Sequence, residues 1–312
     1  MTPGRELQLK LKHEARFRSE LRGLFAAIAR DYRVALQRGR MPDVHARSGE
    51  SLTSLLVGHY RAVGSDFRWA TQSRMQASLR LSDEENAELS VRLAGVYDDR
   101  AEKQASQISQ TTQRQMQAMP TQAGQALRQE RGEEATAEER NALAASQFAM
   151  VMARRVKVIA TYETQWSAET AKILEVEALM QAGGQIVVKS LSSAVKIWRS
   201  QGDSRVRTGV FNHLSADGQR VPVSEPFTVS GESLMWPGDT SYGASVGNVI
   251  NCRCSAIYEA ESIEELRRIL GRPATENPAA FDFPLTESEV VVGLDLPSSD
   301  VAFPVLDLPD EN

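Results

Sequence analysis

The sequence predicts an α+β protein in three parts: a long N-terminal helical region at residues 1–149, a compact domain of mixed helix and short strands at 150–272, and an extended acidic tail at 273–312. Two observations predict this class. Up to the glycine pair at 183–184, apolar residues recur every three or four positions, which is the period of amphipathic helices. Beyond that pair the period shortens to two and tight-turn pairs appear, as is typical of short strands.

Four long helices are expected in the first part of the chain. The first covers residues 5–40 and the second opens at Ser51, each with one apolar face. The third begins at Ser82, because the three acidic residues that follow it favour a helix N-terminus. The fourth begins at Thr136. Residues 104–129 contain nine glutamines and little apolar surface, so they are expected to form an exposed helix or a segment that orders on assembly.

Shorter elements are expected after the glycine pair. Residues 185–189 indicate a strand and 190–199 a short helix. A strand at 219–223 follows a tight Asp-Gly turn, and 250–258 is expected to be the last strand. A helix at 259–270 then precedes the tail.

Charge is distributed unevenly along the chain. Residues 1–80 have a net charge of +8, and residues 273–312 have no basic residue and a net charge of −9. A basic head and an acidic tail are typical of a chain whose two ends meet different partners. The tail repeats Leu-Asp-Leu-Pro at 294–297 and 306–309, which favours a docking peptide for a protein groove or sheet edge.

Several classes are disfavoured by what the sequence lacks. No stretch approaches eighteen uncharged apolar residues, so no membrane partner is expected, and the N-terminus has no apolar core of a signal peptide. With two cysteines in all, a reducing compartment such as the cytosol is the default expectation. The sequence contains no G-x-S-x-G, Walker or H-E-x-x-H motif, so an enzyme is not expected.

One segment holds many turn, charged and sulfur-containing residues in a fixed order. In chain order they are Trp198, Asp203, Arg207, His213, Asp217, Gly218, Phe227, Pro237, Gly238, Asp239, Asn251, Cys252 and Cys254. This order resembles the head-morphogenesis domain of tailed phages, the minor head protein family typified by the F protein of phage Mu. The resemblance covers residues 150–258. One departure is that the Arg-Thr-Glu-Thr common on the leading helix of the family reads Thr161-Tyr-Glu-Thr here.

The resemblance implies a structural or assembly role in the virion. Such a protein would be built into the procapsid in the host cytoplasm and would then lie inside the head, near the portal vertex, in few copies. The portal protein is the expected partner of the basic N-terminal helices, which we favour over non-specific contact with packaged double-stranded DNA. The acidic tail is expected to contact the major capsid or scaffolding protein. Two other classes stay open: a metal-dependent enzyme acting on a phosphoester or nucleic acid, and a DNA-binding internal protein ejected with the genome.

Three residues of this segment invite metal chemistry. On a strand, Cys252 and Cys254 would present both thiols on one side, which disfavours a disulfide between them and suits two thiolates on one zinc ion. His213 would be the third ligand, with Asp217, Asp239 or water as the fourth. Two other readings stay open: a packed histidine beside two inert thiols, and a cysteine nucleophile paired with the histidine.

Overall fold

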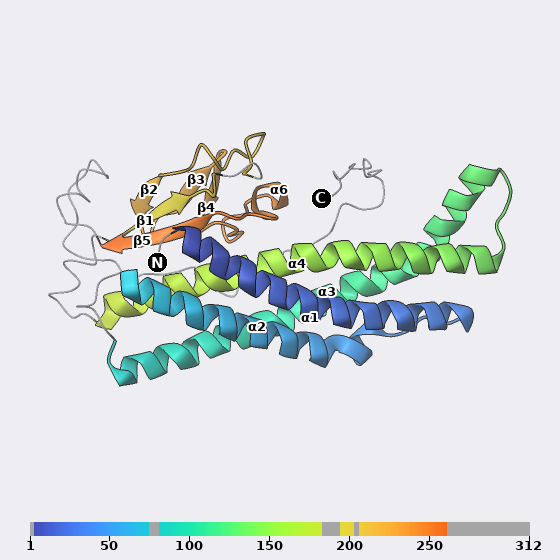
Figure 1. Cartoon of the computed structure of the whole chain (residues 1–312), viewed down its shortest axis with the longest axis horizontal. Helices are drawn as coiled ribbons and strands as arrows, with labels where there is room; N and C mark the ends of the chain where they lie inside the picture. The colour runs from blue at the N-terminus through green and yellow to red at the C-terminus, as the bar shows by residue number, and fades with distance from the viewer. Residues whose placement is uncertain (1–2, 75–80, 183–193, 203–205, 261–312) are drawn as a thin grey trace.

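A computed structural model describes residues 3–74, 81–182, 194–202 and 206–260 of the chain (Figure 1). Four long helices come first and are followed by short strands and one helical turn, so the α+β class is confirmed. The helices are α1 (Pro3–Gln37), α2 (Val44–Arg74), α3 (Asp83–Arg131), α4 (Ala137–Ala182) and α6 (Val246–Val249). The strands are β1 (Ala194–Arg199), β2 (Arg220–Pro222), β3 (Phe227–Val229), β4 (Glu232–Leu234) and β5 (Ser255–Ala260).

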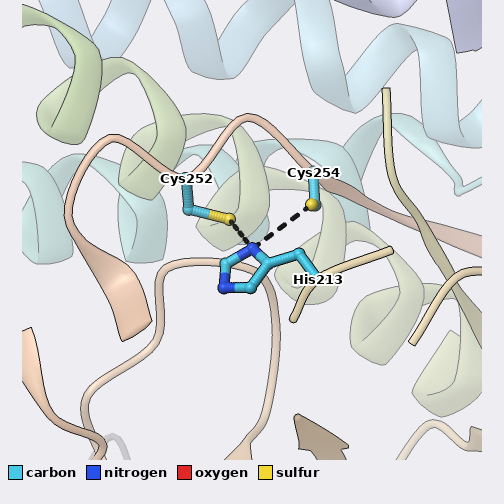
Figure 2. A group of neighbouring side chains, drawn as sticks. All are labelled: His213, Cys252 and Cys254. Atoms are coloured by element: carbon cyan, nitrogen blue, oxygen red, sulfur yellow. Dashed lines mark hydrogen bonds between the residues drawn. The ribbon is translucent and has the colours of Figure 1, made fainter. Parts of the chain in front are cut away.

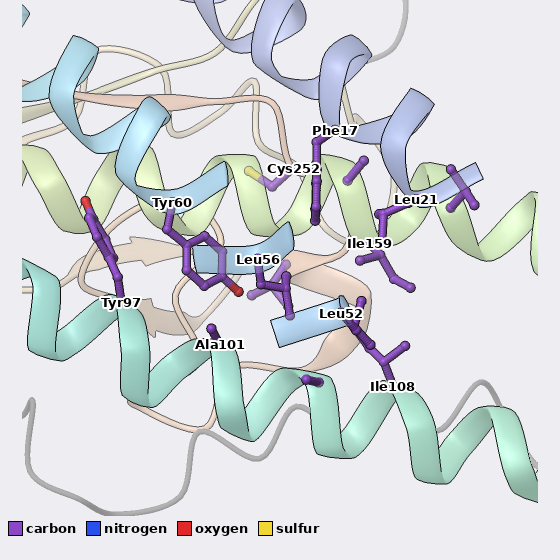
Figure 3. Packing of buried hydrophobic residues seen from close by; sticks show 14 of the residues in the cluster. Phe17, Leu21, Leu52, Leu56, Tyr60, Tyr97, Ala101, Ile108, Ile159 and Cys252 are labelled. Carbon is purple, nitrogen blue, oxygen red and sulfur yellow. The ribbon is translucent and has the colours of Figure 1, made fainter. Parts of the chain in front are cut away.

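The four long helices pack side by side around one apolar core. Phe17 and Leu21 of α1, Leu52 and Leu56 of α2, and Ile159 of α4 are at most 2% exposed and meet between the helices (Figure 3). The helices α1 and α4 run antiparallel, because residues early in α1 contact residues late in α4 and the end of α1 reaches the start of α4. Each helix therefore buries its apolar stripe against two or three others.

Helix starts follow the capping chemistry expected from the sequence. The Ser82 hydroxyl accepts from the Glu85 N–H at 3.2 Å, and the Glu85 carboxylate accepts from the Ser82 N–H at 2.6 Å. Thr136 and Glu139 form the same reciprocal pair ahead of α4. The second helix starts earlier than expected, at Val44 instead of Ser51, and the prediction was wrong by about two turns.

The glutamine-rich segment is part of α3, and one of its faces is buried. The expectation that it has little apolar surface to bury was wrong. Small and flexible side chains supply the buried stripe, including Ala105, Ile108, Met116 and Met119. Arg155 of α4 adds polar contacts, donating to the Thr112 hydroxyl at 2.7 Å and to the Gln115 side chain at 3.1 Å. Alanine and methionine fill a helix interface without the bulky residues that mark one in a sequence.

Residues 194–199 form a strand, which corrects the short helix expected at 190–199. β1 pairs antiparallel with β5 along its whole length and with β2 along part of it, giving the sheet order β2-β1-β5. Five of its six residues are buried, since both faces of the strand are covered. A strand covered on both faces loses the alternation of apolar and polar residues that identifies a strand in sequence.

The sheet and the β3–β4 hairpin lie at the end of the bundle where α1 begins and α4 ends (Figure 1). The helix α4 runs unbroken through residue 150, so the boundary drawn there from the sequence falls inside a helix whose later half packs against β5. The helix expected at 259–270 was wrong for its first two residues, which belong to β5. Its residues from 261 onward, the expected strand at 185–189 and the tail at 273–312 lie outside the described residues.

Candidate metal centre

Two loops build the candidate centre. His213 lies in the loop between β1 and β2, where its backbone N–H donates to the Arg207 carbonyl at 3.0 Å. Gly218 has a φ of 79° and turns this loop back, so that its N–H donates to the carbonyl of Trp198 at 2.9 Å. Cys252 and Cys254 lie in the segment between α6 and β5, and the prediction that they are part of a strand at 250–258 was wrong, because β5 begins at Ser255. The fold thereby joins residues 39 and 41 positions apart.

Three metal-ligand atoms meet at this place (Figure 2). The Nδ1 atom of His213 lies 3.6 Å from the sulfur of Cys252 and 3.6 Å from the sulfur of Cys254. All three ligand atoms lie within 4.8 Å of one another, and the three residues are at most 4% exposed. Both cysteines are free thiols. The triad of one imidazole and two thiols is therefore a set that could hold a metal ion.

The orientation of the His213 ring is fixed from behind by Asn248. The side-chain amide of Asn248 donates to the Val229 carbonyl at 3.1 Å and to the Glu232 carboxylate at 2.8 Å. Its oxygen must then accept from Nε2 of His213, which lies 2.8 Å away. In the neutral ring the proton is consequently on Nε2, and the Nδ1 lone pair faces the two sulfurs, as a metal ligand requires.

In the metal-free triad, the two thiols titrate very differently. The hydrogen bond from Cys254 lowers the pKa of Cys252. Burial raises that pKa, but the interaction with His213 adds to the lowering, so the pKa stays well below its usual range. The hydrogen bond to Cys252 and burial both raise the pKa of Cys254. Burial lowers the pKa of His213, but the Cys252 and Asn248 interactions outweigh it and raise that pKa overall. The site thus stabilises at least one thiolate, the form that binds metals.

Neither aspartate considered as a fourth ligand belongs to the triad. Asp217 is exposed, and its carboxylate accepts from the Ser200 N–H at 2.8 Å. Asp239 is buried and accepts from the Met235 N–H at 2.7 Å and the Ser241 N–H at 2.9 Å. Among the described residues, the group that could hold a metal consists of the histidine and the two cysteines.

The other aromatic motif residues pack directly behind the triad. Trp198 is fully buried, with its ring edge-to-face on His213 at 5.7 Å and on Phe227 at 5.3 Å between centroids. Its indole N–H has no partner at hydrogen-bonding geometry, but it is close enough to Cys254 to oppose the rise in the pKa of that thiol. The tryptophan therefore sets the position of the histidine ring and supplies a partial positive charge to one sulfur.

The Pro-Gly-Asp turn connects the centre to the helical bundle. The carbonyl of Pro237 accepts from the Gln165 side chain of α4 at 2.8 Å. Gly238 has a φ of 91°, and a side chain at this position would approach Gln165 to 3.2 Å. Asn251 adopts a left-handed φ of 53° immediately before Cys252 and so turns the chain into the cysteine segment. Asp203 lies outside the described residues.

A buried ion network beside the centre had no signal in the sequence. Lys10 of α1 donates to Glu169 of α4 at 2.8 Å, to the Ser255 hydroxyl at 2.9 Å and to the carbonyl of Cys254 at 3.3 Å. Lys172 donates to Glu6 at 2.7 Å and to Glu169 at 2.8 Å. The four charged side chains are at most 6% exposed. Lysines and glutamates on a long helix normally face solvent, so residue type alone could not place them here.

A second buried cluster explains the departure noted at Thr161. The carboxylate of Glu163 accepts from the Tyr60 hydroxyl at 2.7 Å and lies 3.5 Å from the guanidinium of Arg100. That guanidinium also stacks on Trp166 at 4.7 Å. The arginine that the resemblance places at the start of the Thr161 tetrapeptide is absent, and Arg100 of α3 pairs with the glutamate. Thr161 itself donates to Glu14 of α1 at 2.9 Å.

No protein-family model, curated protein or solved structure matches the chain in the three comparisons. None of the described helices is long and apolar enough to cross a membrane.

Proposed function

We propose that the chain is a minor head protein of a tailed phage, with a structural role in head assembly at the portal vertex. One observation supports this most directly. Trp198, Cys252 and Cys254, which lie at the two ends of the motif in the sequence, all contact His213. A motif with this internal contact pattern is a folding unit, which makes the resemblance to the head-morphogenesis domain more specific than any of its short pieces.

In this proposal, the helical bundle and the small unit formed by the strands β1–β5 move together as one body. The Pro237 carbonyl and the Cys254 carbonyl both bind Gln165 of α4, so force on either part reaches the other. The N-terminal helices would contact the portal protein, and the acidic tail would contact the major capsid or scaffolding protein. The protein would act in the host cytoplasm during assembly and remain in the virion.

The test is complementation of a phage strain that lacks the gene. The double variant Trp198→Ala/His213→Ala removes the centre of the motif, while Val210→Ala changes a residue of the same loop that is 87% exposed. The double variant should give particles that are poorly infectious or incompletely filled with DNA, and the control should restore the titre. Particle composition by mass spectrometry shows whether the variant is incorporated. A normal titre from the double variant would contradict the assembly role.

We further propose that the triad of His213, Cys252 and Cys254 binds zinc. Zinc accepts imidazole and thiolate ligands together, and Asn248 already holds the histidine in the tautomer that coordination requires. Bound zinc would link the loop before β2 to the segment before β5. The deep burial of all three ligands supports a structural ion over the catalytic ion of a phosphoester-cleaving enzyme, which needs an accessible position for its substrate.

Elemental analysis of protein purified without added metal tests the zinc proposal. About one equivalent of zinc is expected for the native chain, and much less for Cys252→Ser and Cys254→Ser. Val210→Ala is the matched control, since Val210 lies in the same loop as His213 but is 87% exposed, and this variant should retain the metal. Native protein that is metal-free although purified without chelator, and that added zinc does not stabilise, would show a packed histidine with two inert thiols.

A further inference from the structure

Zinc in the proposed site has three protein ligands where it prefers four. The described residues supply one imidazole and two thiols, and both candidate aspartates are engaged elsewhere. The fourth position therefore belongs to a group other than these two carboxylates. The inference that follows depends on the zinc proposal above and concerns what fills this position.

Arg207 supplies the observation that identifies the group. Its backbone carbonyl accepts from the His213 N–H at 3.0 Å, and its Nη2 donates to the carbonyl of Ile250, two residues before Cys252. Its Nη1 is buried without any hydrogen-bond partner. A buried guanidinium N–H without an acceptor is costly, since the group loses its water and receives nothing in return. Among the described residues, Nη1 of Arg207 therefore lacks a hydrogen-bond acceptor.

Two hydrogen bonds place this arginine next to the triad, one from the His213 N–H to its backbone carbonyl and one from its Nη2 to the carbonyl of Ile250. Burial lowers the pKa of Arg207, and the charges of Cys252 and Cys254 act in the opposite direction. Arg207 is therefore hydrogen-bonded directly to one ligand residue and to the turn that leads into the segment of the other two.

The charge balance decides between water and an anion. Two thiolates neutralise a zinc ion, and the imidazole is neutral, so the liganded triad has no net charge. Arg207 forms no salt bridge with a described carboxylate, whereas nearby Lys10 is paired with Glu169. No carboxylate of the described residues therefore compensates the positive charge of Arg207. A small anion satisfies the metal and the guanidinium together, with a charge-assisted hydrogen bond that is stronger than a neutral one.

We propose that a small anion occupies the fourth coordination position of the triad and accepts a hydrogen bond from Nη1 of Arg207. Its size is limited, because His213, Cys252 and Cys254 are 2%, 4% and 3% exposed. Halide and azide are of the right class, whereas a nucleotide or a phosphoester substrate is too large for a site so deeply covered. The centre is then an anion-closed structural site.

Cobalt substitution of the full-length protein tests this, since the visible bands of cobalt report its ligands without any activity assay. Azide and bromide should shift the bands saturably in the native chain. Arg207→Met should weaken the anion affinity by about tenfold or more, the usual size of a hydrogen bond to a charged group. Arg207→Lys keeps the charge and should lose less. Arg220→Met removes the same charge from β2 and should leave the affinity unchanged.

Three outcomes would overturn the inference. Tetrahedral cobalt bands that no anion changes would show that the protein itself fills the fourth position. Equal anion affinities for the native chain and Arg207→Met would remove the arginine from the site, provided that thermal unfolding shows the variant to be folded. A protein that binds neither cobalt nor zinc would overturn the zinc proposal and, with it, the anion.

Discussion

The side chain of Gln165, in the middle of α4, donates a hydrogen bond of 2.9 Å to the backbone carbonyl of Cys254. The same carbonyl lies 3.3 Å from the ammonium group of Lys10 in α1. One side of the cysteine segment is thus held by the helical bundle, while the sulfur of Cys254 faces His213 on the other. Order in the triad and docking of the bundle are therefore coupled through a single residue.

If the triad holds zinc as proposed, removal of the metal should loosen the contact between α1 and the strands β1–β5. A ligand present at a thousand times its Kd stabilises the folded state by about 4 kcal/mol, which corresponds to a rise in Tm of about 10 °C for a chain of this size. Chelation should lower Tm accordingly and speed amide hydrogen exchange in β5 and in α1 around Lys10. The Cys252→Ser/Cys254→Ser protein should not respond to chelator. Unchanged exchange in α1 after proven zinc loss would show that the coupling is absent.

Lys10→Met should destabilise the fold strongly. It removes one of the two lysines that contact Glu169 and leaves Lys172 as the cation beside that buried carboxylate. Breaking a buried ion pair from one side costs about 3–5 kcal/mol. Lys12→Met is the matched control, since Lys12 is exposed on the same helix and its loss should change the free energy of unfolding by less than about 0.5 kcal/mol. Urea unfolding measures both variants.

The double variant Lys10→Met/Glu169→Gln tests the reason for that loss. Neutralising the carboxylate removes the uncompensated charge that Lys10→Met leaves behind. The double variant should accordingly be more stable than Lys10→Met alone. If it is less stable than the single variant, the lost packing and hydrogen bonds of Lys10, and not the charge on Glu169, dominate the effect.

Amphipathic period and caps predicted most of the bundle, because both depend on residues close in sequence. The helix boundary at Ser82 was predictable from one serine and the acidic residues after it. The β1 strand was not, since its alternation is lost when both faces are buried. The buried stripe of α3 was also missed, because alanine and methionine do not distinguish an interface from a neutral surface.

The three candidate ligands of the site were predictable from the chemistry of their side chains. A histidine with a Cys-x-Cys pair indicated the triad, and its atoms do meet. The supporting groups were not predictable. Asn248 and Gln165 act through hydrogen bonds to distant loops, and nothing in an amide side chain shows in advance which carbonyl it will reach. Lys10 has the sequence environment of a surface lysine, yet it is buried.

His59 should make the fold sensitive to mild acid. Its Nε2 donates to the Thr164 hydroxyl at 3.0 Å, because that hydroxyl gives its own proton to the Ala160 carbonyl. Burial, and then the charges of His13 and Arg16, lower its pKa to about 3. Below about pH 6.5 the unfolded chain binds a proton that the folded chain excludes. Stability should fall as pH drops from about 6.5 toward 3, by about 2 kcal/mol between pH 6.5 and 5.

His59→Gln isolates this contribution, because glutamine can still donate to Thr164 and does not titrate. The free energy of unfolding, measured in urea from pH 7.5 to 4.5, should depend less on pH in the variant than in the native chain. Parallel pH profiles would mean that other groups govern the acid response. Glu6 is one such group: burial raises its pKa, but the charges of Lys172 and Lys10 outweigh burial and lower that pKa to about 2.

Salt dependence and two kinds of substitution should show whether the N-terminal region binds DNA or the portal protein. Arg22, Arg30 and Arg33 are exposed on α1, and none of them forms a salt bridge with a described residue. By contrast, a hollow of about 560 Å³ between α2 and α3 is lined by Trp69, which is 69% exposed, and by Leu93. Basic side chains suit DNA phosphates, whereas an exposed tryptophan beside a hollow suits an apolar protein contact.

Full-length protein should be titrated against duplex DNA and against portal protein at about 50 and 200 mM salt, since contacts with phosphates weaken steeply over this range. We expect portal binding that survives the higher salt and is weakened by Trp69→Ser more than by Arg30→Glu/Arg33→Glu, because buried apolar contacts are not screened. DNA binding would reverse that order of variants and lose affinity steeply with salt. Tight, salt-sensitive DNA binding without portal binding would rule out the portal as the partner and make the basic face of α1 a phosphate-binding surface.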